Sequence, residues 1–304
     1  MSDQANHPAD TPLYPIREVS RLTGVNAVTL RAWERRYGLI RPRRTPKGHR
    51  LYAREDIERV ERILQWLNRG VPVSQVRELL EQPDAVEAPP PAAGDWESQR
   101  RQLIAAAEAL DLARLEALFN QGLSLYPVAT CIDELWQPVI RELEEGWDER
   151  LGADLQRRAL EAFLRTRIGT RLYHANPVAA GPLVLIVPMP DDGGPLWGLL
   201  AALAASDRGY RVQLLDAPLP VQELPLAVER FHADALLLAS GRAEKADLIR
   251  RQLPRLAEQL DVPLTLCGPV ARIREADLNG TGVEVLGDDL PRAMTRLQSL
   301  TQAA

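Results

Sequence analysis

The stretch TLRAWERRYGLIRPRRTPKGHRLY, residues 29–52, gathers arginines around one tryptophan. From Arg17 to Arg54 the sequence has eleven Lys and Arg residues but only two acidic residues. Residues 1–82, called the head below, carry 15 basic and 10 acidic side chains. The rest of the chain, called the body, carries 22 basic and 32 acidic side chains. The net charge of −5 is therefore the sum of a basic head and an acidic body. Such an asymmetry often marks a contact with nucleic acid.

The composition is that of an ordinary globular chain of 304 residues, with 45% hydrophobic and 26% charged residues. No apolar run reaches the roughly 18 residues of a transmembrane helix, and the first residues lack the apolar core of a signal peptide. We therefore expect a cytoplasmic protein without a membrane contact. The two cysteines, Cys131 and Cys267, form neither a disulfide framework nor a paired zinc site. We expect both in the core, and no metal.

Two short helices with a tight turn between them are predicted near the N-terminus. Gly24 can end the first helix, and Asn26 can cap the second. In the second helix Leu30, Trp33 and Tyr37 recur on one side, which predicts that Trp33 lies in the core. This order of elements is a helix-turn-helix pattern.

The opposite face of the second helix presents Arg31 and Arg35, with Thr29 and Arg36 beside them. Arginine is shaped for bidentate contact with guanine or phosphate. The residues that follow predict a β-hairpin wing around a Pro-Lys-Gly turn, which would lie along the DNA backbone. Its basic side chains are Arg43, Arg44, Lys47, His49 and Arg50.

Each of these features has a simpler explanation when it stands alone. A run of charges is usually a solvated surface, and His49 in a wing is expected to be solvated or to face phosphate rather than to bind a metal. The ordered combination of helix-turn-helix, basic hairpin and a following amphipathic helix, which begins near Arg54, favours DNA binding.

The segment IREVSRLTGVNAVTLRAWERRYGLIRPRRTPKGHRLYAREDIERV resembles the MerR-type winged helix-turn-helix, and the resemblance covers residues 14–82. It includes the T-L-R-x-W-E stretch, the Gly-Leu-Ile that starts the wing, the G-x-R-x-Y that closes it and the Asp-Ile that follows. It implies a transcription regulator that binds near-palindromic promoter DNA as a homodimer and acts on RNA polymerase. By position, Thr29, Arg31 and Arg35 would face the major groove, and the backbone would be held by Arg43, Arg44, Lys47, Arg50 and Tyr52.

The chain departs from the MerR pattern at Pro83, where a long dimer-forming helix is usual. Dimerisation is therefore expected from the body. Residues 83–95 contain four prolines and predict an extended linker, and residues 1–13 are expected to be disordered.

The body divides into two predicted parts. Residues 96–176 show apolar residues at helical spacing and predict a four-helix bundle, with Asp111 as an N-cap. Over residues 177–304, five continuous apolar runs alternate with helical segments, which predicts a doubly wound parallel sheet. The predicted fold class is thus multidomain: an α-rich winged helix-turn-helix, a four-helix bundle and a Rossmann-like α/β domain.

A helical bundle followed by such a sheet resembles the vitamin B12-binding module of methyltransferases and of light-responsive MerR-like repressors. The order of parts is similar to that of MerR-like activators of curli and biofilm genes. In the B12-binding family the first strand leads into E-x-H-x-x-G, whose histidine coordinates cobalt. Aligning the last glycine with Gly198 puts Pro195 at the histidine and Gly193 at the glutamate. Because proline offers no donor atom to a metal, we expect no cofactor, cobalamin included.

The bundle signature of the light-responsive members, a Trp followed at fixed spacing by Glu-His, is also altered. Trp147 can fill the Trp position, but Arg157 and Arg158 take the other two. A pocket between bundle and sheet could still hold a planar ligand, or the tryptophans could simply be core. The candidate pocket residues are Trp136, Trp147, Asp192, Trp197 and Ser240.

Three functions are therefore compared. The first is a homodimeric transcription regulator whose B12-like domain serves assembly or senses an effector other than cobalamin. The second is a B12-dependent light-sensing repressor. The third is an enzyme tethered to DNA, but no G-x-G-x-x-G, P-loop or nucleophile elbow is present, so we predict no catalytic residues. The lost cobalt ligand favours the first over the second.

Overall fold

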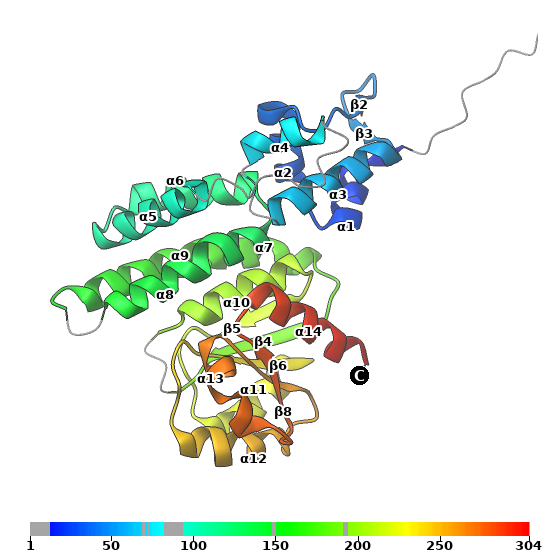
Figure 1. The fold of residues 1–304 in the computed structure, drawn as a ribbon. Coiled ribbons are helices and arrows are strands. Elements are labelled where there is room, and N and C mark those ends of the chain that lie inside the picture. The colour runs from blue at the N-terminus through cyan, green and yellow to red at the C-terminus, as the bar shows by residue number, and fades with distance from the viewer. Residues whose placement is uncertain are drawn as a thin grey trace, which may run out of the picture. The chain divides into compact units, whose positions relative to one another are not determined.

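The computed structural model (Figure 1) describes residues 13–68, 71, 73–81, 94–147, 150–190 and 194–303. The predicted linker, up to residue 93, and the predicted disordered N-terminus, up to residue 12, lie outside the described residues. Within the described part, no helix combines the length and the apolar character that crossing a membrane requires.

The described residues form two compact units. The first combines residues 1–99 with residues 117–130, and the second combines residues 100–116 with residues 131–304. The first unit contains the predicted DNA-binding head. The second contains the parallel sheet and the helices packed against it.

The head has the predicted winged helix-turn-helix fold. Its helices are α1 (Ile16–Thr23), α2 (Ala27–Ala32) with a π-helical continuation (Trp33–Tyr37), α3 (Arg54–Asn68) and α4 (Val73–Leu80). Its antiparallel sheet has the order β1-β3-β2 and comprises β1 (Tyr14–Pro15), β2 (Arg43–Arg44) and β3 (Arg50–Tyr52). The sequence analysis had not predicted β1 or the π-helical turn.

The predicted helix ends in the head are confirmed. Gly24 follows α1 in the left-handed conformation, with φ 72°. Asn26 Oδ1 accepts a hydrogen bond from the Thr29 backbone N–H at 2.9 Å, which satisfies one of the first free amides of α2. These two residues set the turn between the helices, and Trp33 is fully buried as predicted.

Trp33 also anchors a distant part of the first unit. Its Nε1–H donates to the backbone carbonyl of Leu125, at 2.7 Å, in a buried hydrogen bond. Leu125 is the last residue of a helix, and the last carbonyls of a helix have no hydrogen-bond donor within that helix. The indole N–H of Trp33 supplies the missing donor. Beside it, the rings of Trp96 and Tyr126 pack with their centres 4.5 Å apart.

The helical segments predicted for residues 96–176 are present. They are α5 (Gly94–Glu108), α6 (Leu112–Leu125), α7 (Val128–Cys131) running through a π-helical turn (Ile132–Trp136) into α8 (Gln137–Gly146), and α9 (Ala153–Ala175). The predicted N-cap is confirmed, since Asp111 Oδ1 accepts from the Arg114 backbone N–H at 2.9 Å.

All five apolar runs of the C-terminal part form parallel strands in the order β5-β4-β6-β7-β8. These are β4 (Leu183–Pro188), β5 (Arg211–Leu214), β6 (Ala235–Ala239), β7 (Leu264–Cys267) and β8 (Val283–Gly287). The central strand β6 is buried along its whole length, as expected of a strand covered on both faces.

Helices cover both faces of this sheet (Figure 1). One face carries α10 (Leu196–Asp207) and α14 (Leu290–Ala303), and α10 packs in turn on α9. The other face carries α11 (Leu224–Phe231), α12 (Leu253–Ala257) and α13 (Pro269–Leu278). Cys131 and Cys267 are buried as predicted, and burial raises the pKa of the Cys267 thiol to about 12.

Gly268, directly after β7, has a backbone conformation that other residues rarely adopt, with φ 90° and ψ −174°. A Cβ at this position would lie 2.8 Å from the Ser240 carbonyl oxygen. We expect Gly268→Ala to lower the free energy of unfolding by about 1–3 kcal/mol through strain and steric conflict. Chemical denaturation measures this loss.

Gly169→Ala is the matched control, because Gly169 lies inside α9 with no atom within 4 Å of its would-be Cβ. It should raise the stability by about 0.5–1 kcal/mol, since alanine is the better helix former. Equal effects of the two substitutions would contradict the strain assigned to Gly268.

Candidate DNA interface and sensor cavity

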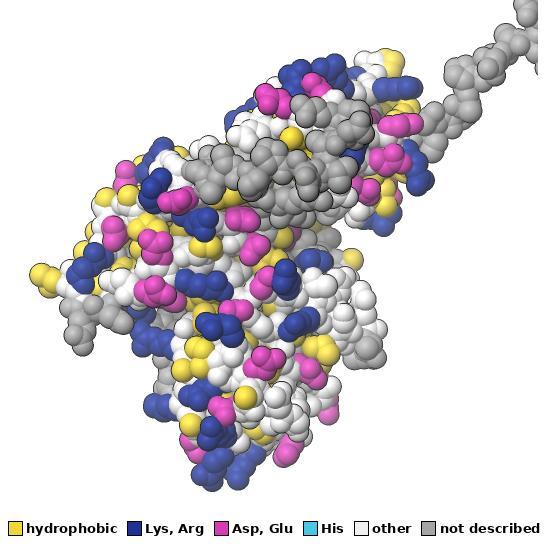
Figure 2. All heavy atoms as spheres, in the orientation of Figure 1, with side chains coloured by type: hydrophobic (Ala, Val, Ile, Leu, Met, Phe, Trp, Pro, Cys, Tyr) yellow, Lys and Arg dark blue, Asp and Glu magenta, His cyan; other side chains and the backbone are white. Residues whose placement is uncertain are grey.

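The second helix of the head, called the reading helix below, exposes the face that is predicted to contact DNA bases, called the reading face. Arg31, Arg35 and Arg36 all lie at the surface of α2 and its π-helical continuation. Val28, on the same face, is 58% exposed although it is apolar. Figure 2 shows Lys and Arg side chains on the surface of the head, with Asp and Glu among them. This face combines hydrogen-bond donors with an apolar side chain, which are the groups that read base edges in the major groove.

The wing is a tight β-hairpin, as predicted. The Thr45 N–H donates to the His49 carbonyl at 2.9 Å, and the Gly48 N–H donates to the Thr45 carbonyl at 2.8 Å. Arg43, Lys47 and His49 are exposed along this hairpin. A rigid hairpin with exposed cations suits contact with the phosphate backbone.

Glu34 fastens the wing to the reading helix. Its carboxylate accepts from Arg44 Nη2 at 2.7 Å and from Arg50 Nε on the neighbouring strand. Burial acts to raise the pKa of Glu34, but the hydrogen bonds from Arg50 and Arg44 outweigh it, so that the pKa lies below its usual value. The sequence analysis counted Glu34 only as a charge, although it is the one acid in residues 29–52.

Two of the residues assigned to DNA by position are not at the surface. Thr29 and Tyr52 are both 0% exposed. Burial, together with the negative charge of Glu34, raises the pKa of Tyr52 to about 12. In this conformation both side chains pack beneath the interface and do not lie on it. Thr29 and Arg31 are two positions apart on α2 and so point to opposite sides of the helix. Tyr52 lies on β3, where it pairs with Tyr14 of β1. The exposed or half-exposed candidates are Arg31, Arg35, Arg36, Arg43, Arg44, Lys47, His49 and Arg50.

We expect Glu34→Gln to lower the free energy of unfolding by about 1–2 kcal/mol near neutral pH, because it removes charge-assisted hydrogen bonds to two arginines. The folded-state pKa of Glu34 lies below the ordinary 4.5. The pairing therefore stabilises the fold above that pH and its contribution is lost as the pH falls through the lowered pKa. Denaturation at a series of pH values should show the difference between wild type and variant shrinking in acid.

Glu61→Gln serves as the control, since Glu61 is an exposed acid on α3. It removes the same charge from the head and should change the stability by less than about 0.5 kcal/mol. A Glu34→Gln effect that is equally large at every pH would show that the loss does not come from the ionised pairs.

A cavity of about 530 Å³ lies in the second unit. It is bounded by α8 and α9 and by the residues that follow β6 and β7. In doubly wound sheets, ligands bind at the carboxyl ends of the strands, where these residues stand. The charged residues that line the cavity are Arg141, Glu144, Glu145, Arg157, Arg242 and Arg272.

Two predicted pocket tryptophans lie behind these charges. Trp197 is fully buried, and its Nε1–H donates to Glu144 Oε2 at 3.0 Å. The Arg141 guanidinium carbon lies 5.5 Å from the centre of the Trp197 ring. The guanidinium carbon of Arg157 lies 5.1 Å from the centre of the Trp147 ring. The tryptophans thus support the arginines through cation–π contacts.

The other predicted pocket residues are placed differently. Ser240 is buried next to Gly241, which lines the cavity. Trp136 is 2% exposed and does not line it. Asp192 and Gly193 lie outside the described residues.

Burial raises the pKa of Glu144, although the hydrogen bond from Trp197 acts to lower it.

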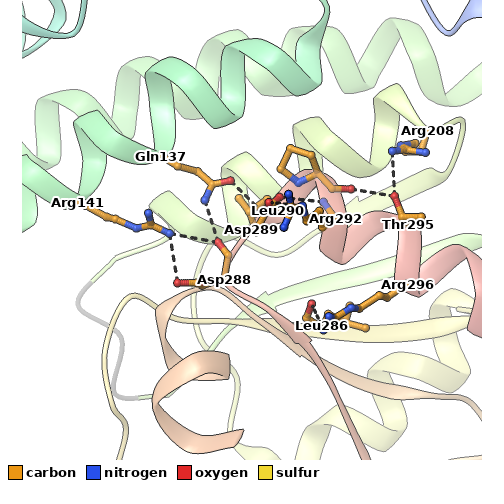
Figure 3. A network of polar contacts seen from close by, with 11 residues as sticks. Gln137, Arg141, Arg208, Leu286, Asp288, Asp289, Leu290, Arg292, Thr295 and Arg296 are labelled. Atoms are coloured by element: carbon orange, nitrogen blue, oxygen red, sulfur yellow. Dashed lines mark hydrogen bonds and ion pairs between the residues drawn. The ribbon is translucent and has the colours of Figure 1, made fainter. Parts of the chain in front are cut away.

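A polar network holds Arg141 at the cavity (Figure 3). Gln137 Nε2 donates to the Asp288 carbonyl at 2.8 Å, and Gln137 Oε1 accepts from the Leu290 N–H at 3.0 Å. These bonds fasten α8 to the segment before α14. The Asp288 carboxylate then pairs with Arg141 at 3.4 Å and with Arg272 at 2.9 Å. Sequence analysis had missed Gln137 and Asp288, because their pairing joins segments far apart in the chain.

Glu161 of α9 lies next to Gly194, just before the start of α10. A Cβ on Gly194 would lie 2.0 Å from Glu161 Oε1, so a larger residue there would require the Glu161 carboxylate to shift. Glu161 is 2% exposed, and its Oε2 accepts from Arg158 Nη1 at 2.9 Å. Of the two arginines that replace Glu-His, Arg158 pairs with Glu161 and Arg157 faces the cavity.

Comparisons with known proteins agree with this architecture. Residues 14–83 match the MerR HTH family regulatory protein. The HTH-type transcriptional regulator MlrA of Escherichia coli is 32% identical, over 81% of this chain and 96% of MlrA. The HTH-type transcriptional repressor CarH of Myxococcus xanthus is 28% identical, over 90% of this chain and 94% of CarH. A solved structure, the monomethylamine corrinoid protein of Methanosarcina barkeri, is 13% identical with a TM-score of 0.49, and the match covers 67% of this chain and 99% of that one.

The fold and the basic head define a DNA-binding regulator with a B12-binding-like C-terminal domain. The chain belongs to the MerR family of helix-turn-helix transcriptional regulators. Its relatives are named as transcriptional regulators and repressors, in agreement with the prediction of a regulator that is not an enzyme.

One prediction is wrong. Because of Pro195 we expected no cofactor, cobalamin included, whereas the matches to the repressors CarH and CarA of Myxococcus xanthus point to a B12 cofactor rather than to none. The physical reason is that losing the cobalt donor removes one bond. It does not remove the contacts that hold the rest of so large a molecule.

The structure itself bears on the fit of such a group. Pro195 precedes α10 and offers no donor atom to cobalt. Three buried polar atoms, Trp147 Nε1, Arg157 Nε and Glu161 Oε1, have no hydrogen-bond partner among the described residues. Of these three residues only Arg157 lines the cavity, so it is the one placed to hold such a group, without a protein ligand to its metal from position 195.

Proposed function

We propose that this protein binds promoter DNA as a homodimer and couples transcription to a corrinoid held by its C-terminal domain. The observation that carries the DNA-binding part is the exposed Arg31–Arg35 face beside a basic wing in a MerR-family chain. In this proposal Arg31 and Arg35 read base edges, and Arg43 and Lys47 neutralise phosphates.

The dimer is proposed to form through the body. In the head, α3 and α4 are short, with 15 and 8 residues, and supply no long coil for a partner. A dimer would present two reading helices to the two halves of a near-palindromic site, since operator symmetry mirrors protein symmetry. Action on RNA polymerase is proposed from the family resemblance.

The corrinoid part of the proposal rests on the cavity and on the relatives. Arg157 lines the cavity and would contact the cofactor, and Trp147 packs against its guanidinium. A bound corrinoid would supply the chemistry of its cobalt to the sensor. The role of this chain's residues is to hold the molecule beside α8 and α9.

A light-sensing repressor is a second candidate, favoured by the match to the repressor CarH along most of both chains. An experiment separates this light-sensing repressor from a regulator that does not sense light: the DNA affinity is measured with adenosylcobalamin in the dark and after illumination. A light-dependent change in affinity selects the repressor, and equal affinities select a regulator that does not sense light.

Arg31→Ala should weaken binding to a cognate promoter by about 1–3 kcal/mol through lost base readout. Arg43→Ala should weaken binding to all sequences alike and reduce the slope of log affinity against log salt by about 1, as expected of a phosphate contact. Fluorescence anisotropy with cognate and scrambled duplexes at several salt concentrations measures both effects.

Arg230→Ala is the matched control, because Arg230 is an exposed arginine on α11 in the second unit. It removes the same charge and should leave the affinity unchanged. If Arg230→Ala weakened binding as much as Arg31→Ala, net charge rather than the reading face would explain the affinity.

The body should carry the dimer contact. We expect the full chain, and also residues 94–304 alone, to sediment as dimers at about micromolar concentration, since an interface of standard size supports such affinity. Sedimentation equilibrium checks this. A dimeric full chain with a monomeric fragment 94–304 would place the contact in the head.

A further inference from the structure

We propose that Val28 is a specificity-determining residue of the DNA interface and that it reads the 5-methyl group of a thymine in the major groove. This inference deepens the proposed function and rests on it for the binding of promoter DNA by the head. It adds an apolar contact to an interface whose predicted residues were all polar, and it assigns the base that this contact recognises.

The position of Val28 on the reading helix is the first argument. Within α2, Val28 and Arg31 are the two exposed residues. The two residues between them, Thr29 and Leu30, are fully buried. Residues three positions apart lie on the same face of a helix. A major groove that meets Arg31 therefore meets Val28 as well.

The chemistry of Val28 is the second argument. Its side chain is 58% exposed and ends in two methyl groups, so burial in this chain does not explain it. Valine is also a weaker helix former than alanine or the long charged residues, because its branched Cβ restricts the side chain. Single exposed apolar residues are common on protein surfaces, but this one stands among arginines on the reading face. An apolar group of the partner would explain valine at this position.

Thymine supplies such a group. In the major groove it presents a C5 methyl that the other bases of DNA lack, and apolar side chains contact this methyl in direct readout. The guanidinium groups of Arg31 and Arg35 are donors only, so they recognise acceptors such as O6 and N7 of guanine. Val28 is the exposed apolar side chain beside them and is suited to the methyl group.

The surroundings of Val28 favour this assignment. Thr29 also carries a methyl group and was predicted to face the groove, but it is 0% exposed. The first turn of α2 contains no acidic residue, which would repel the phosphates on either side of the groove. The methyl groups of Val28 are thus the apolar surface that this turn offers to a base edge.

The spacing of Val28 and Arg31 predicts what the two residues read together. Three residues of an α-helix span about 4.5 Å along its axis, and successive base pairs of DNA are about 3.4 Å apart. In a helix that lies along the groove, the two side chains therefore reach base pairs that are neighbours or nearly so. We expect each half-site to have a thymine within about two base pairs of a guanine, the base that arginine prefers.

The test uses the full-length protein and a DNA site that it selects from random duplexes over repeated rounds of binding. Each thymine of the selected site is then replaced by deoxyuridine, which lacks only the 5-methyl group. We expect the replacement at one position of each half-site to weaken binding by about 3- to 5-fold, as the loss of one buried methyl group predicts. Fluorescence anisotropy measures the affinities.

Val28→Ser should reduce this preference for thymine over deoxyuridine to less than about 2-fold, because it removes both methyl groups. Serine and valine have similar helix propensities, and the side chain is exposed, so the variant should fold. Val28→Ile keeps a branched apolar side chain and should keep the preference. Circular dichroism and thermal unfolding establish that each variant is folded.

Leu226→Ser is the matched control, because Leu226 is an apolar residue of α11 in the second unit and is 52% exposed. It should keep the full preference for thymine. A selected site in which no deoxyuridine replacement weakens binding would overturn the inference. So would a Val28→Ser protein that keeps the preference, or a Leu226→Ser protein that loses it.

Arg31→Ala separates a failure of this inference from a failure of the proposed function. If Arg31→Ala weakens binding to the selected site but deoxyuridine does not, the methyl contact is wrong and the DNA interface stands. If the full-length protein enriches no sequence from the random duplexes, both are wrong.

Discussion

The buried indole of Trp33 is the contact on which the arrangement of the first unit depends. Its ring is buried in the core of the head, and its N–H donates a hydrogen bond to the backbone carbonyl of Leu125 at 2.7 Å. A buried donor of this kind is costly to leave unpaired, so the reading helix is tied to residues more than ninety positions away in sequence. The orientation of Arg31 and Arg35 follows from the side of the helix that Trp33 occupies.

The DNA interface and the cavity differ in whether their arginines find partners within the protein. In the head, Glu34 engages Arg44 and Arg50 and makes the wing and the reading helix one rigid surface, while Arg31 and Arg43 remain exposed. In the cavity, by contrast, a buried arginine nitrogen stays unsatisfied. The first arrangement stabilises the protein by itself, whereas the second leaves a buried donor without a partner among the described residues.

By the resemblance, Pro195 stands at the position of the cobalt-binding histidine, and proline offers no donor atom to a metal. The inference from one lost bond to no cofactor was too strong, because a large ligand is held by many contacts. Arg157 and the other charged residues that line the cavity are polar groups that such a ligand could contact.

The sequence by itself determined the elements and the family. The helix ends at Gly24, Asn26 and Asp111, the five parallel strands and the core position of Trp33 depend on local chemistry and periodicity, which can be read from neighbouring residues. Only the tertiary structure decided which charges meet. The Glu34 pairs, the burial of Thr29 and Tyr52, and the Gln137–Asp288 network join residues distant in the chain or depend on packing. No local pattern encodes such contacts, since they arise only when the fold brings the segments together.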